Sequence, residues 1–282
     1  MNHITITGFS DEISPSFHTQ LEALREFGLD HLELRAADGV NVSDFTPEKL
    51  RDVKDSLRSH GISVSAIGSP IGKISIEEPF APHMEKFKRT LEIQKELEAP
   101  YLRMFSFYIP KGQDPASCRS QVLERLSAMV EEARRWNSLL LHENEKGIYG
   151  DTAPRCLDLM EQLSGPCFRA IFDFANFVEV GQPTWEAFQV LRPYIEYVHV
   201  KDATAEKKIV PAGQGVGQVK EILAQLFSGG WKGYLSLEPH LTNFSGLAAL
   251  EQDPKKREAC LDGKEAWALA LNALRKILEE LV

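Results

Sequence analysis

The chain has 282 residues, of which 43% are hydrophobic and 26% charged, and its formal net charge is −9. This length fits one α/β barrel domain, which commonly takes about 250 residues. The negative charge argues against a nucleic-acid partner, because phosphate binding relies on clustered lysines and arginines. Every apolar run is shorter than the roughly 18 residues of a membrane span, so we expect no membrane insertion.

The first residues and the cysteines both favour a cytoplasmic protein. Residues 1–5 run directly into a strand-like pattern without the basic and apolar segments of a signal peptide. The cysteines form no C-x-x-C pair, and reduced cytosolic thiols explain their scatter better than a disulfide framework or a zinc knuckle. These cysteines are Cys118, Cys156, Cys167 and Cys260.

Short apolar runs alternate with longer amphipathic stretches along the whole chain. The apolar runs predict strands, whereas the stretches between them have helical spacing, as at Leu21, Leu24 and Phe27. The predicted strands are 3–9, 31–35, 62–68, 101–105, 138–143, 168–173, 195–199 and 233–238.

Several predicted helices carry end signals. Ser14 and Thr46 each precede a proline, which is typical of a capping hydroxyl followed by a proline in the first helical turn. Gly28 and Gly61 stand just before the next predicted strand, where a left-handed residue commonly ends a helix.

Eight strands that alternate with helices predict a parallel sheet, because parallel strands need crossover helices. An open sheet would normally have a glycine-rich turn after the first strand, and residues 8–12 do not form one. We therefore predict α/β class and one (β/α)₈ barrel domain over residues 1–282. The longest irregular stretch is expected at 240–264, after the eighth strand.

Four consecutive predicted strands, the fifth to the eighth, end in Glu143, Asp173, His199 and Glu238. Because the carboxyl ends of barrel strands share one face, these side chains should converge. A single acid at a strand end often only caps the next helix, as Asp202 could, but four in succession favour a metal site. Three carboxylates and one imidazole suit one divalent ion, with Mn²⁺ as first choice and Mg²⁺, Co²⁺, Zn²⁺ or Fe²⁺ as alternatives.

Other polar residues near this face are candidates for substrate contacts. His142 is not among them, since strand alternation turns it away from Glu143 and toward the helices. Arg103 could instead form a salt bridge with Glu33 inside the barrel. The glycines at 213–217 stand where barrels can bind phosphate, although a lone G-x-G-x-G is a weak signal. The candidates for substrate binding are Ser69, Lys73, Arg103, Glu145, Asn176, Lys201 and His240.

With these residues in place, the chain resembles the sugar phosphate isomerase/epimerase superfamily of xylose isomerase-like TIM barrels along essentially its whole length. The resemblance is carried by His-x-Lys-Asp at 199–202, by Glu-Pro-His at 238–240, and by segments 65–73 and 143–152. In such relatives the Glu, Asp, His, Glu set binds one divalent metal, which implies the same role for the four strand-end residues here.

The resemblance also separates branches of the superfamily. Its endonuclease branch holds three zinc ions and needs additional histidines, where this chain has Ser69, Ser106 and Asn176. We therefore expect no nuclease activity. Ketose epimerases often have a histidine at the position of Asn176, so this residue departs from their pattern.

The chemistry implied is proton transfer beside a carbonyl of a carbohydrate, through an enediolate, with Glu143 and Glu238 as the catalytic acid–base pair. This describes an isomerase or epimerase of carbohydrate metabolism. One alternative is a lyase or dehydratase that acts on an inosose or a 3-keto-glycoside. A second is a non-catalytic barrel that binds a polyol. A homo-oligomer is compatible with the fold, but no sequence feature fixes a dimer or tetramer.

Overall fold

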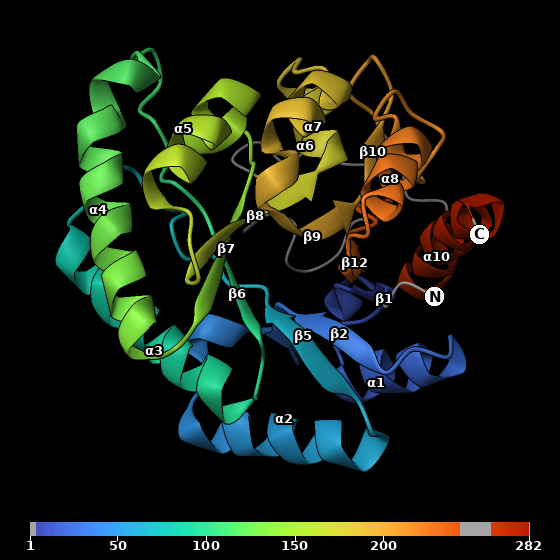
Figure 1. Cartoon of the computed structure of the whole chain (residues 1–282). Coiled ribbons are helices and arrows are strands. Elements are labelled where there is room, and N and C mark those ends of the chain that lie inside the picture. Colours follow the sequence, from blue (N-terminus) through green and yellow to red (C-terminus); the bar gives the residue numbers. More distant parts are fainter. Residues whose placement is uncertain (1–3, 243–260, 282) are drawn as a thin grey trace.

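The computed structural model describes residues 4–242 and 261–281, which form a ring of parallel strands surrounded by helices (Figure 1). The barrel strands are β1 (Ile4–Gly8), β2 (His31–Leu34), β5 (Ser63–Ile67), β6 (Tyr101–Met104), β7 (Leu139–Glu143), β8 (Phe168–Asp173), β9 (Ile195–Val200) and β12 (Gly233–Leu237). The helices are α1 (Phe17–Glu26), α2 (Pro47–His60), α3 (Phe80–Glu96), α4 (Pro115–Arg135), α5 (Ala153–Leu163), α6 (Phe174–Glu179), α7 (Thr184–Leu191), α8 (Val219–Ser228) and α10 (Gly263–Leu281).

Parallel ladders join the barrel strands in the order β1-β12-β9-β8-β7-β6-β5-β2. The two ends of this order, β1 and β2, lie next to each other, so the sheet curls into a nearly closed barrel. The predicted (β/α)₈ architecture is confirmed. Two short hairpins extend the loops after β2 and β9, namely β3 (Ala36–Ala37) with β4 (Val40–Asn41), and β10 (Asp202–Ala203) with β11 (Ile209–Val210).

The predicted helix-end signals hold at α2 but not at the start of α1. The Thr46 hydroxyl accepts a backbone N–H of the first turn of α2, and Gly61 ends this helix with a φ of 65°. The helix α1 instead begins at Phe17 after the cap Ser16. Ser14 lies in the turn before it, where its hydroxyl accepts the Ser16 N–H. The prediction of a Ser14 cap was therefore wrong by two residues.

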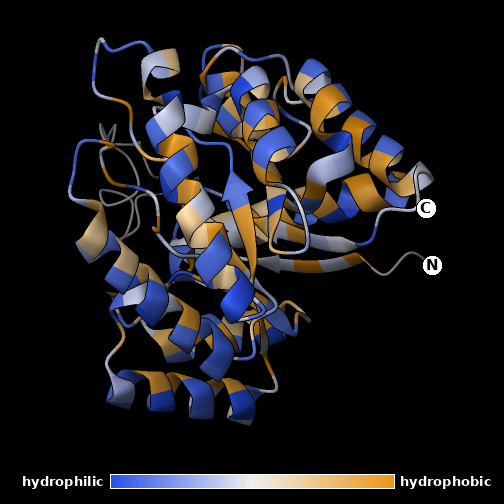
Figure 2. Cartoon of the chain, turned by 60° about the vertical axis from the view of Figure 1, so that its left-hand side comes forward, coloured by the Kyte–Doolittle hydropathy of each residue, from blue (hydrophilic) through white to orange (hydrophobic). Residues whose placement is uncertain are grey.

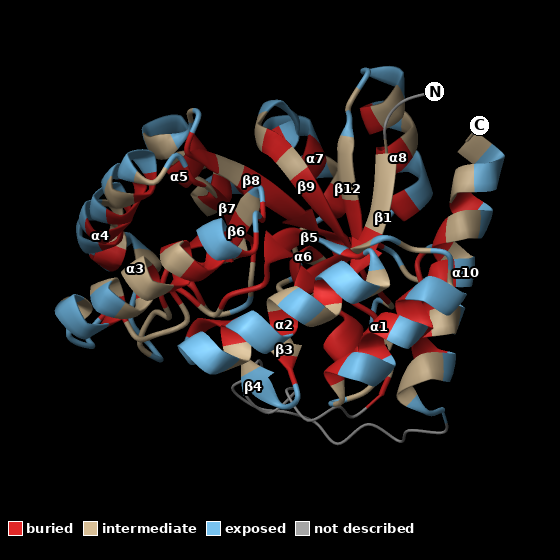
Figure 3. Ribbon diagram, turned by 90° about the horizontal axis from the view of Figure 1, so that it is seen from below, coloured by how far each residue is buried: buried red, intermediate tan, exposed pale blue. Residues whose placement is uncertain are grey.

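The hydrophobic core lies mainly between the strands and the inner faces of the helices. Figure 2 shows apolar and polar stripes along the helices, and Figure 3 shows buried strands enclosed by helices whose outer faces are exposed. A smaller apolar cluster of Ala66, Leu141, Ile171 and Tyr197 lies apart from this core. The main core fixes the strands, and therefore fixes the positions of the residues at their carboxyl ends.

Two sequence expectations concern membranes and the long loop. No helix in the ranges 4–242 and 261–281 is long and apolar enough to cross a bilayer. The irregular stretch expected at 240–264 falls largely on residues 243–260, which lie outside the described residues, as does Cys260. Of the other cysteines, Cys118, Cys156 and Cys167 are buried free thiols.

Candidate metal centre

The four side chains predicted to converge do lie together at the carboxyl ends of the strands. Glu143 and Asp173 end β7 and β8, His199 lies near the end of β9, and Glu238 directly follows β12. One ligand atom from each lies within 4.8 Å of the others, and all four residues are buried. Strand register produces this arrangement, because Asp173 pairs with His199 across the β8–β9 ladder.

The His199 ring points its Nδ1 atom at the three carboxylates. This atom lies 3.0 Å from Glu143 Oε1, 3.6 Å from Glu238 Oε2 and 3.9 Å from Asp173 Oδ2. The Nε2 atom points the other way and lies 3.0 Å from Glu33 Oε2. The nitrogen that faces the cluster is therefore Nδ1.

Asp173 has one oxygen engaged by the backbone and one directed at the cluster. Its Oδ1 accepts the Asn176 N–H at 2.8 Å and so caps α6. The Asn144 side-chain amide holds the Asp173 main chain, through its N–H at 2.9 Å and its carbonyl at 3.0 Å. The Oδ2 atom is buried without a hydrogen-bond partner among the described residues and lies 3.3 Å from Lys201 Nζ. Such an atom is a ready ligand for a cation.

Buried cations neutralise part of the negative charge of the cluster. Arg103 Nη1 donates to Glu143 Oε2 at 3.0 Å, and Lys201 Nζ donates to Glu238 Oε2 at 2.9 Å. Arg35 Nη1 lies 3.3 Å from Glu238 Oε1. Each glutamate therefore has both a cationic partner and an oxygen near His199 Nδ1.

These neighbours divide the carboxyl groups by protonation state. Burial raises the pKa of Glu143, but His199 and Arg103 outweigh it and lower the pKa to about 2. Burial also raises the pKa of Glu238, but Lys201 and His240 outweigh it, so this pKa lies well below its usual range. Asp173 behaves differently, since burial raises its pKa to about 8 despite Lys201. A cation in the cluster would favour the ionised form of Asp173.

The donor set and its geometry fit one divalent ion. Three carboxylates and one imidazole are ligands that Mn²⁺, Mg²⁺, Zn²⁺ and related ions accept. The buried Asp173 Oδ2 and the inward-facing His199 Nδ1 supply ligand atoms without further rearrangement of the chain. The residues of the cluster could therefore hold a metal through Glu143, Asp173, His199 and Glu238.

Several predicted substrate contacts lie against the cluster. Arg103 and Lys201 donate to Glu143 and Glu238, and Asn176 Nδ2 lies 3.3 Å from Glu143 Oε1 and donates to the Asn144 carbonyl at 2.9 Å. His240 Nε2 lies 3.2 Å from Glu238 Oε1. These four residues were expected at this face, and the fold brings them together.

The other three candidates, Lys73, Glu145 and Ser69, form their hydrogen bonds or ion pairs with residues outside the cluster of four. Lys73 and Glu145 form an ion pair at 2.8 Å that joins the loops after β5 and β7. The Ser69 hydroxyl donates to the Arg103 carbonyl at 2.5 Å and accepts the Ile71 N–H at 3.3 Å. The backbone thus engages Ser69 in both hydrogen-bonding directions.

The partners of Arg103 and His142 differ in how far they match the sequence predictions. The alternative pairing of Arg103 with Glu33 was wrong. The Arg103 guanidinium donates to Glu143, and the Glu33 carboxyl group lies against His199 Nε2. His142 is buried away from the cluster as expected, with its Nε2 3.0 Å from the Ser106 hydroxyl.

Sequence reasoning missed the contribution of the loop after β1. Arg35 Nε donates to Asp11 Oδ2 at 2.8 Å, and Arg35 Nη2 lies 3.2 Å from Glu12 Oε1. Glu12, Glu238 and His240 also bring possible ligand atoms close together. The Arg35 guanidinium already supplies positive charge to both glutamates there. The available signal was the pair of acids Asp11 and Glu12, three and four residues after the first strand, at the same face as the other strand ends.

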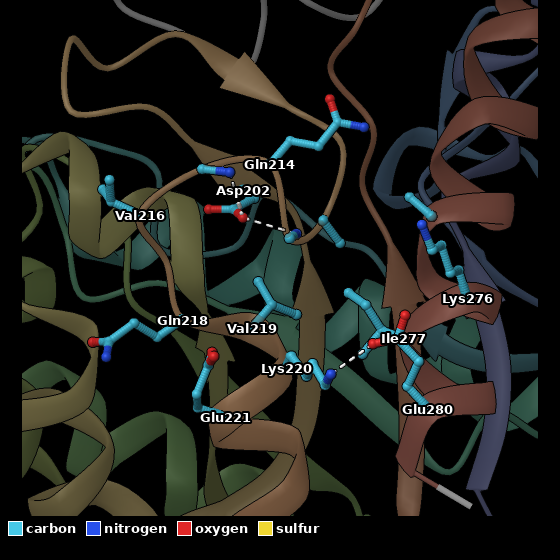
Figure 4. Close-up of a pocket in the computed structure, with 14 residues that line it drawn as sticks. Asp202, Gln214, Val216, Gln218, Val219, Lys220, Glu221, Lys276, Ile277 and Glu280 are labelled. Atoms are coloured by element: carbon cyan, nitrogen blue, oxygen red, sulfur yellow. Dashed lines mark hydrogen bonds and ion pairs between the residues drawn. The ribbon is translucent and has the colours of Figure 1, made fainter.

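The glycine-rich segment after β9 is organised by Asp202 rather than left open for phosphate. The carboxylate accepts the N–H groups of Gly213, Gly215 and Gly217 at 3.0, 3.0 and 2.9 Å, and that of Ala203 at 2.8 Å. A pocket of about 430 Å³ lies beside this loop, between α8 and α10 (Figure 4). Because an anion of the protein already occupies these amides, the loop gives no support to a phosphate site.

The fold and the buried cluster together define a (β/α)₈ barrel with a candidate divalent-metal centre at the carboxyl ends of its strands. The chain belongs to the xylose isomerase-like TIM barrel family, whose model matches residues 21–277. It is 22% identical over 190 residues to a 3-dehydroshikimate dehydratase from Bacillus anthracis. The aligned residues make up 67% of this chain and 68% of that relative.

Solved structures share the fold over almost the full length. The IOLI protein with a bound zinc atom has a TM-score of 0.77 and 15% identity, with 99% of each chain covered. A D-psicose 3-epimerase determined in the presence of D-fructose has a TM-score of 0.74 and 17% identity, covering 100% of this chain and 99% of that one. At these identities the likeness shows the fold.

Proposed function

We propose that this chain is a divalent-metal-dependent isomerase or epimerase that moves a proton beside the carbonyl of a sugar or keto-sugar. The observation that carries the proposal is the buried set of Glu143, Asp173, His199 and Glu238, with ligand atoms within 4.8 Å of one another. When bound there, a divalent ion would act as a Lewis acid toward a substrate carbonyl and an adjacent hydroxyl. We take Mn²⁺ as the first choice.

Glu143 and Glu238 are the proposed proton-transfer residues. Their lowered pKa values keep both ionised near neutral pH, so each is available as a base. They come from β7 and from the end of β12, strands that β8 and β9 separate in the barrel, and so approach the centre from different sides. Return of the proton to the other face of the same carbon gives epimerisation, and return to the neighbouring carbon gives isomerisation.

The remaining polar residues are proposed to bind and orient the substrate. Arg103 and Lys201 can donate to substrate oxygens while they fix the glutamates, and Asn176 and His240 lie beside the same carboxylates. Lys73 and Glu145 form a further polar pair over the loops. Ser69 is the weakest of the proposed contacts, because its hydroxyl is engaged by the backbone. We further propose that the substrate is a small carbohydrate and that the protein is cytoplasmic.

A second candidate is a dehydratase or other lyase. The relative from Bacillus anthracis is a 3-dehydroshikimate dehydratase, and loss of a proton beside a carbonyl is also the first step in expelling a β-hydroxyl group. The same two glutamates would serve either reaction. A non-catalytic barrel that binds a polyol is less well supported, because all four candidate ligands are present.

Solvent-deuterium exchange followed by NMR tests the proposal. The Mn²⁺-treated and chelator-stripped proteins are incubated in deuterated buffer with ketoses, inososes, 3-keto-glucosides and cyclic β-hydroxy ketones. If the proposed proton transfer takes place, a hydrogen on a carbon beside the substrate carbonyl should exchange for deuterium only when the metal is present. The position of the label separates epimerase from isomerase, and an unsaturated product identifies a lyase.

A matched pair of variants controls for general damage. Glu143→Gln should reduce exchange by about 10²- to 10⁴-fold. Glu196→Gln should leave it unchanged, since Glu196 lies at the amino end of β9 and accepts the Tyr101 hydroxyl at 2.9 Å. Exchange that persists after metal removal, or a protein that retains no divalent ion, would overturn the proposal.

A further inference from the structure

A carboxylate lies inside the barrel behind the candidate metal centre. Barrel interiors are usually filled by layers of branched apolar side chains. Glu33 is fully buried in this interior and comes from β2, on the other side of β1 and β12 from His199. A buried carboxyl group is costly unless hydrogen-bonding partners offset its desolvation, so the partners of Glu33 are informative.

The local geometry of β2 directs Glu33 inward. The register between β2 and β5 shifts between Leu32 and Glu33, so that Glu33 is paired with Ala66. Such irregularities commonly re-aim a side chain near a functional site. Leu32 and Leu34, on either side, belong to the main core between the strands and the helices. Glu33 is therefore the residue of this strand that reaches into the barrel.

Two donors from neighbouring strands converge on one oxygen of Glu33. His199 Nε2 lies 3.0 Å from Glu33 Oε2, and the Ser236 hydroxyl donates to the same oxygen at 2.6 Å. Ser236 and His199 are partners in the β9–β12 ladder, so the backbone sets their spacing. The other oxygen, Oε1, has no hydrogen-bond partner within the described ranges.

This contact decides which nitrogen of His199 can bind a metal. Oε2 of Glu33 accepts the Ser236 hydroxyl and faces Nε2 of His199 as an acceptor too, so Nε2 is the donor and carries a hydrogen. A metal ligand must instead present a lone pair, which leaves Nδ1. That atom is the one that faces Glu143, Asp173 and Glu238.

We propose that Glu33 is a positioning residue that fixes the tautomer and the ring orientation of His199, and thereby strengthens metal binding at the cluster. The inference rests on the proposed function, because it assumes that the cluster binds a divalent ion. Partners of this kind on metal-binding histidines typically change metal affinity by about 10- to 100-fold when they are removed.

The test uses Co²⁺, whose affinity is measured by competition with a chromophoric chelator. Glu33→Gln preserves the size of the side chain but removes its charge, and should weaken Co²⁺ binding by about 10- to 100-fold. Glu196→Gln is the matched control and should leave the affinity unchanged. Ser236→Ala leaves the Glu33 charge in place and should weaken binding less than Glu33→Gln does.

Paramagnetic proton NMR of the Co²⁺-loaded protein reports on the His199 ring directly. The wild type should show a strongly shifted ring N–H signal that exchanges slowly with solvent, because this hydrogen is buried against Glu33. In Glu33→Gln the signal should shift or exchange faster, which a merely structural loss of affinity would not produce.

The outcomes separate this inference from the proposed function. A wild-type protein that binds no divalent ion overturns both. Wild-type binding with unchanged affinity and an unchanged N–H signal in Glu33→Gln overturns the role of Glu33 alone. If Glu33→Gln does not fold, Ser236→Ala decides, and unchanged affinity and signal in that variant overturn the inference.

Discussion

Two buried aspartates lie at the carboxyl ends of neighbouring strands, Asp173 as the last residue of β8 and Asp202 two residues after β9, and they differ in how their carboxylates are satisfied. Asp202 accepts four backbone N–H groups, two on each oxygen. Asp173 has one oxygen bonded to the backbone and another that lacks a hydrogen-bond partner in the described part of the chain. The first carboxylate holds a loop in place, and the second is directed at Glu143 and Glu238.

The number of N–H groups that each buried carboxylate accepts separates one that holds a loop from one that is open to a cation. A buried carboxylate that accepts several N–H groups is stable in its ionised form without a metal. Carboxylates packed against one another are costly unless a cation joins them. We therefore expect changes at Asp202 to affect stability, and changes at the cluster to affect metal binding and turnover.

The largest effect is expected at Asp173. Asp173→Asn keeps an oxygen that can cap α6 but removes one anionic ligand, so metal affinity should fall by about 10³-fold, equivalent to about 4 kcal/mol. Turnover should be lost with the metal. Calorimetric titration with Mn²⁺ measures the change, and Asp202→Asn serves as the control. Equal losses in the two variants would remove the distinction between the centres.

The next effect concerns Glu143 and Glu238, the proposed proton-transfer residues. Glu143→Gln and Glu238→Gln, measured at saturating metal, should each reduce solvent-deuterium exchange by about 10²- to 10⁴-fold, because an amide cannot take the proton. Circular dichroism should show that the fold is retained. Near-wild-type exchange in either variant would contradict the assignment of two catalytic glutamates.

A third prediction concerns the loop that Asp202 holds. Asp202→Ala leaves four N–H groups without their acceptor and should lower the free energy of unfolding by about 3 to 5 kcal/mol. Gly215→Ala should also destabilise, because a Cβ there would lie 2.3 Å from the Ala203 carbonyl oxygen. Urea unfolding measures both. Metal stoichiometry should stay at the wild-type value in whatever fraction is folded, and its loss would show that the two centres are coupled.

The smallest effect is a dependence on pH. The pKa of Asp173 is raised to about 8 in the fold without metal, so a proton occupies it at neutral pH and must leave when a metal binds. Metal affinity should therefore rise with pH up to about 8, by about tenfold per pH unit for the proton that Asp173 releases. Release of the Nδ1 proton of His199 steepens this rise, because Glu143 and Glu33 outweigh burial and raise the pKa of His199. Titrations at several pH values check this, and Asp173→Asn should make the profile less steep.

The pKa shifts of Asp173 and Glu143 also decide how the stability of the metal-free protein changes with pH. Between its unfolded pKa of about 3.9 and its folded value of about 8, Asp173 binds more proton in the folded state, so its contribution to stability falls as pH rises. Glu143 acts oppositely, since its pKa is lowered to about 2, and its contribution is lost as pH falls from about 4.5 toward 2. Thermal unfolding across pH 3 to 9 measures the balance.

Local pattern was enough to predict the barrel and most of the candidate centre. Strand-like runs alternating with helical spacing imply parallel strands, and parallel strands place their carboxyl ends on one face. Glu143, Asp173, His199 and Glu238 could therefore be grouped from sequence, because each stands at or directly after the end of a recognisable strand. The same reasoning placed His142 away from the cluster, since neighbouring residues of a strand face opposite sides.

The partners of these residues were decided only when the barrel closed. Glu33 and His199 are separated by 166 positions and meet because β2 and β9 face one interior. The Arg35 pairs with Asp11, Glu12 and Glu238 likewise depend on the approach of β2 to β1 and β12. Arg103 could have paired with Glu33 or with Glu143, and strand register with side-chain reach selected Glu143. Periodicity sets which face a residue occupies, whereas the choice among several opposite charges on that face depends on distances of an ångström, which only the packed structure fixes.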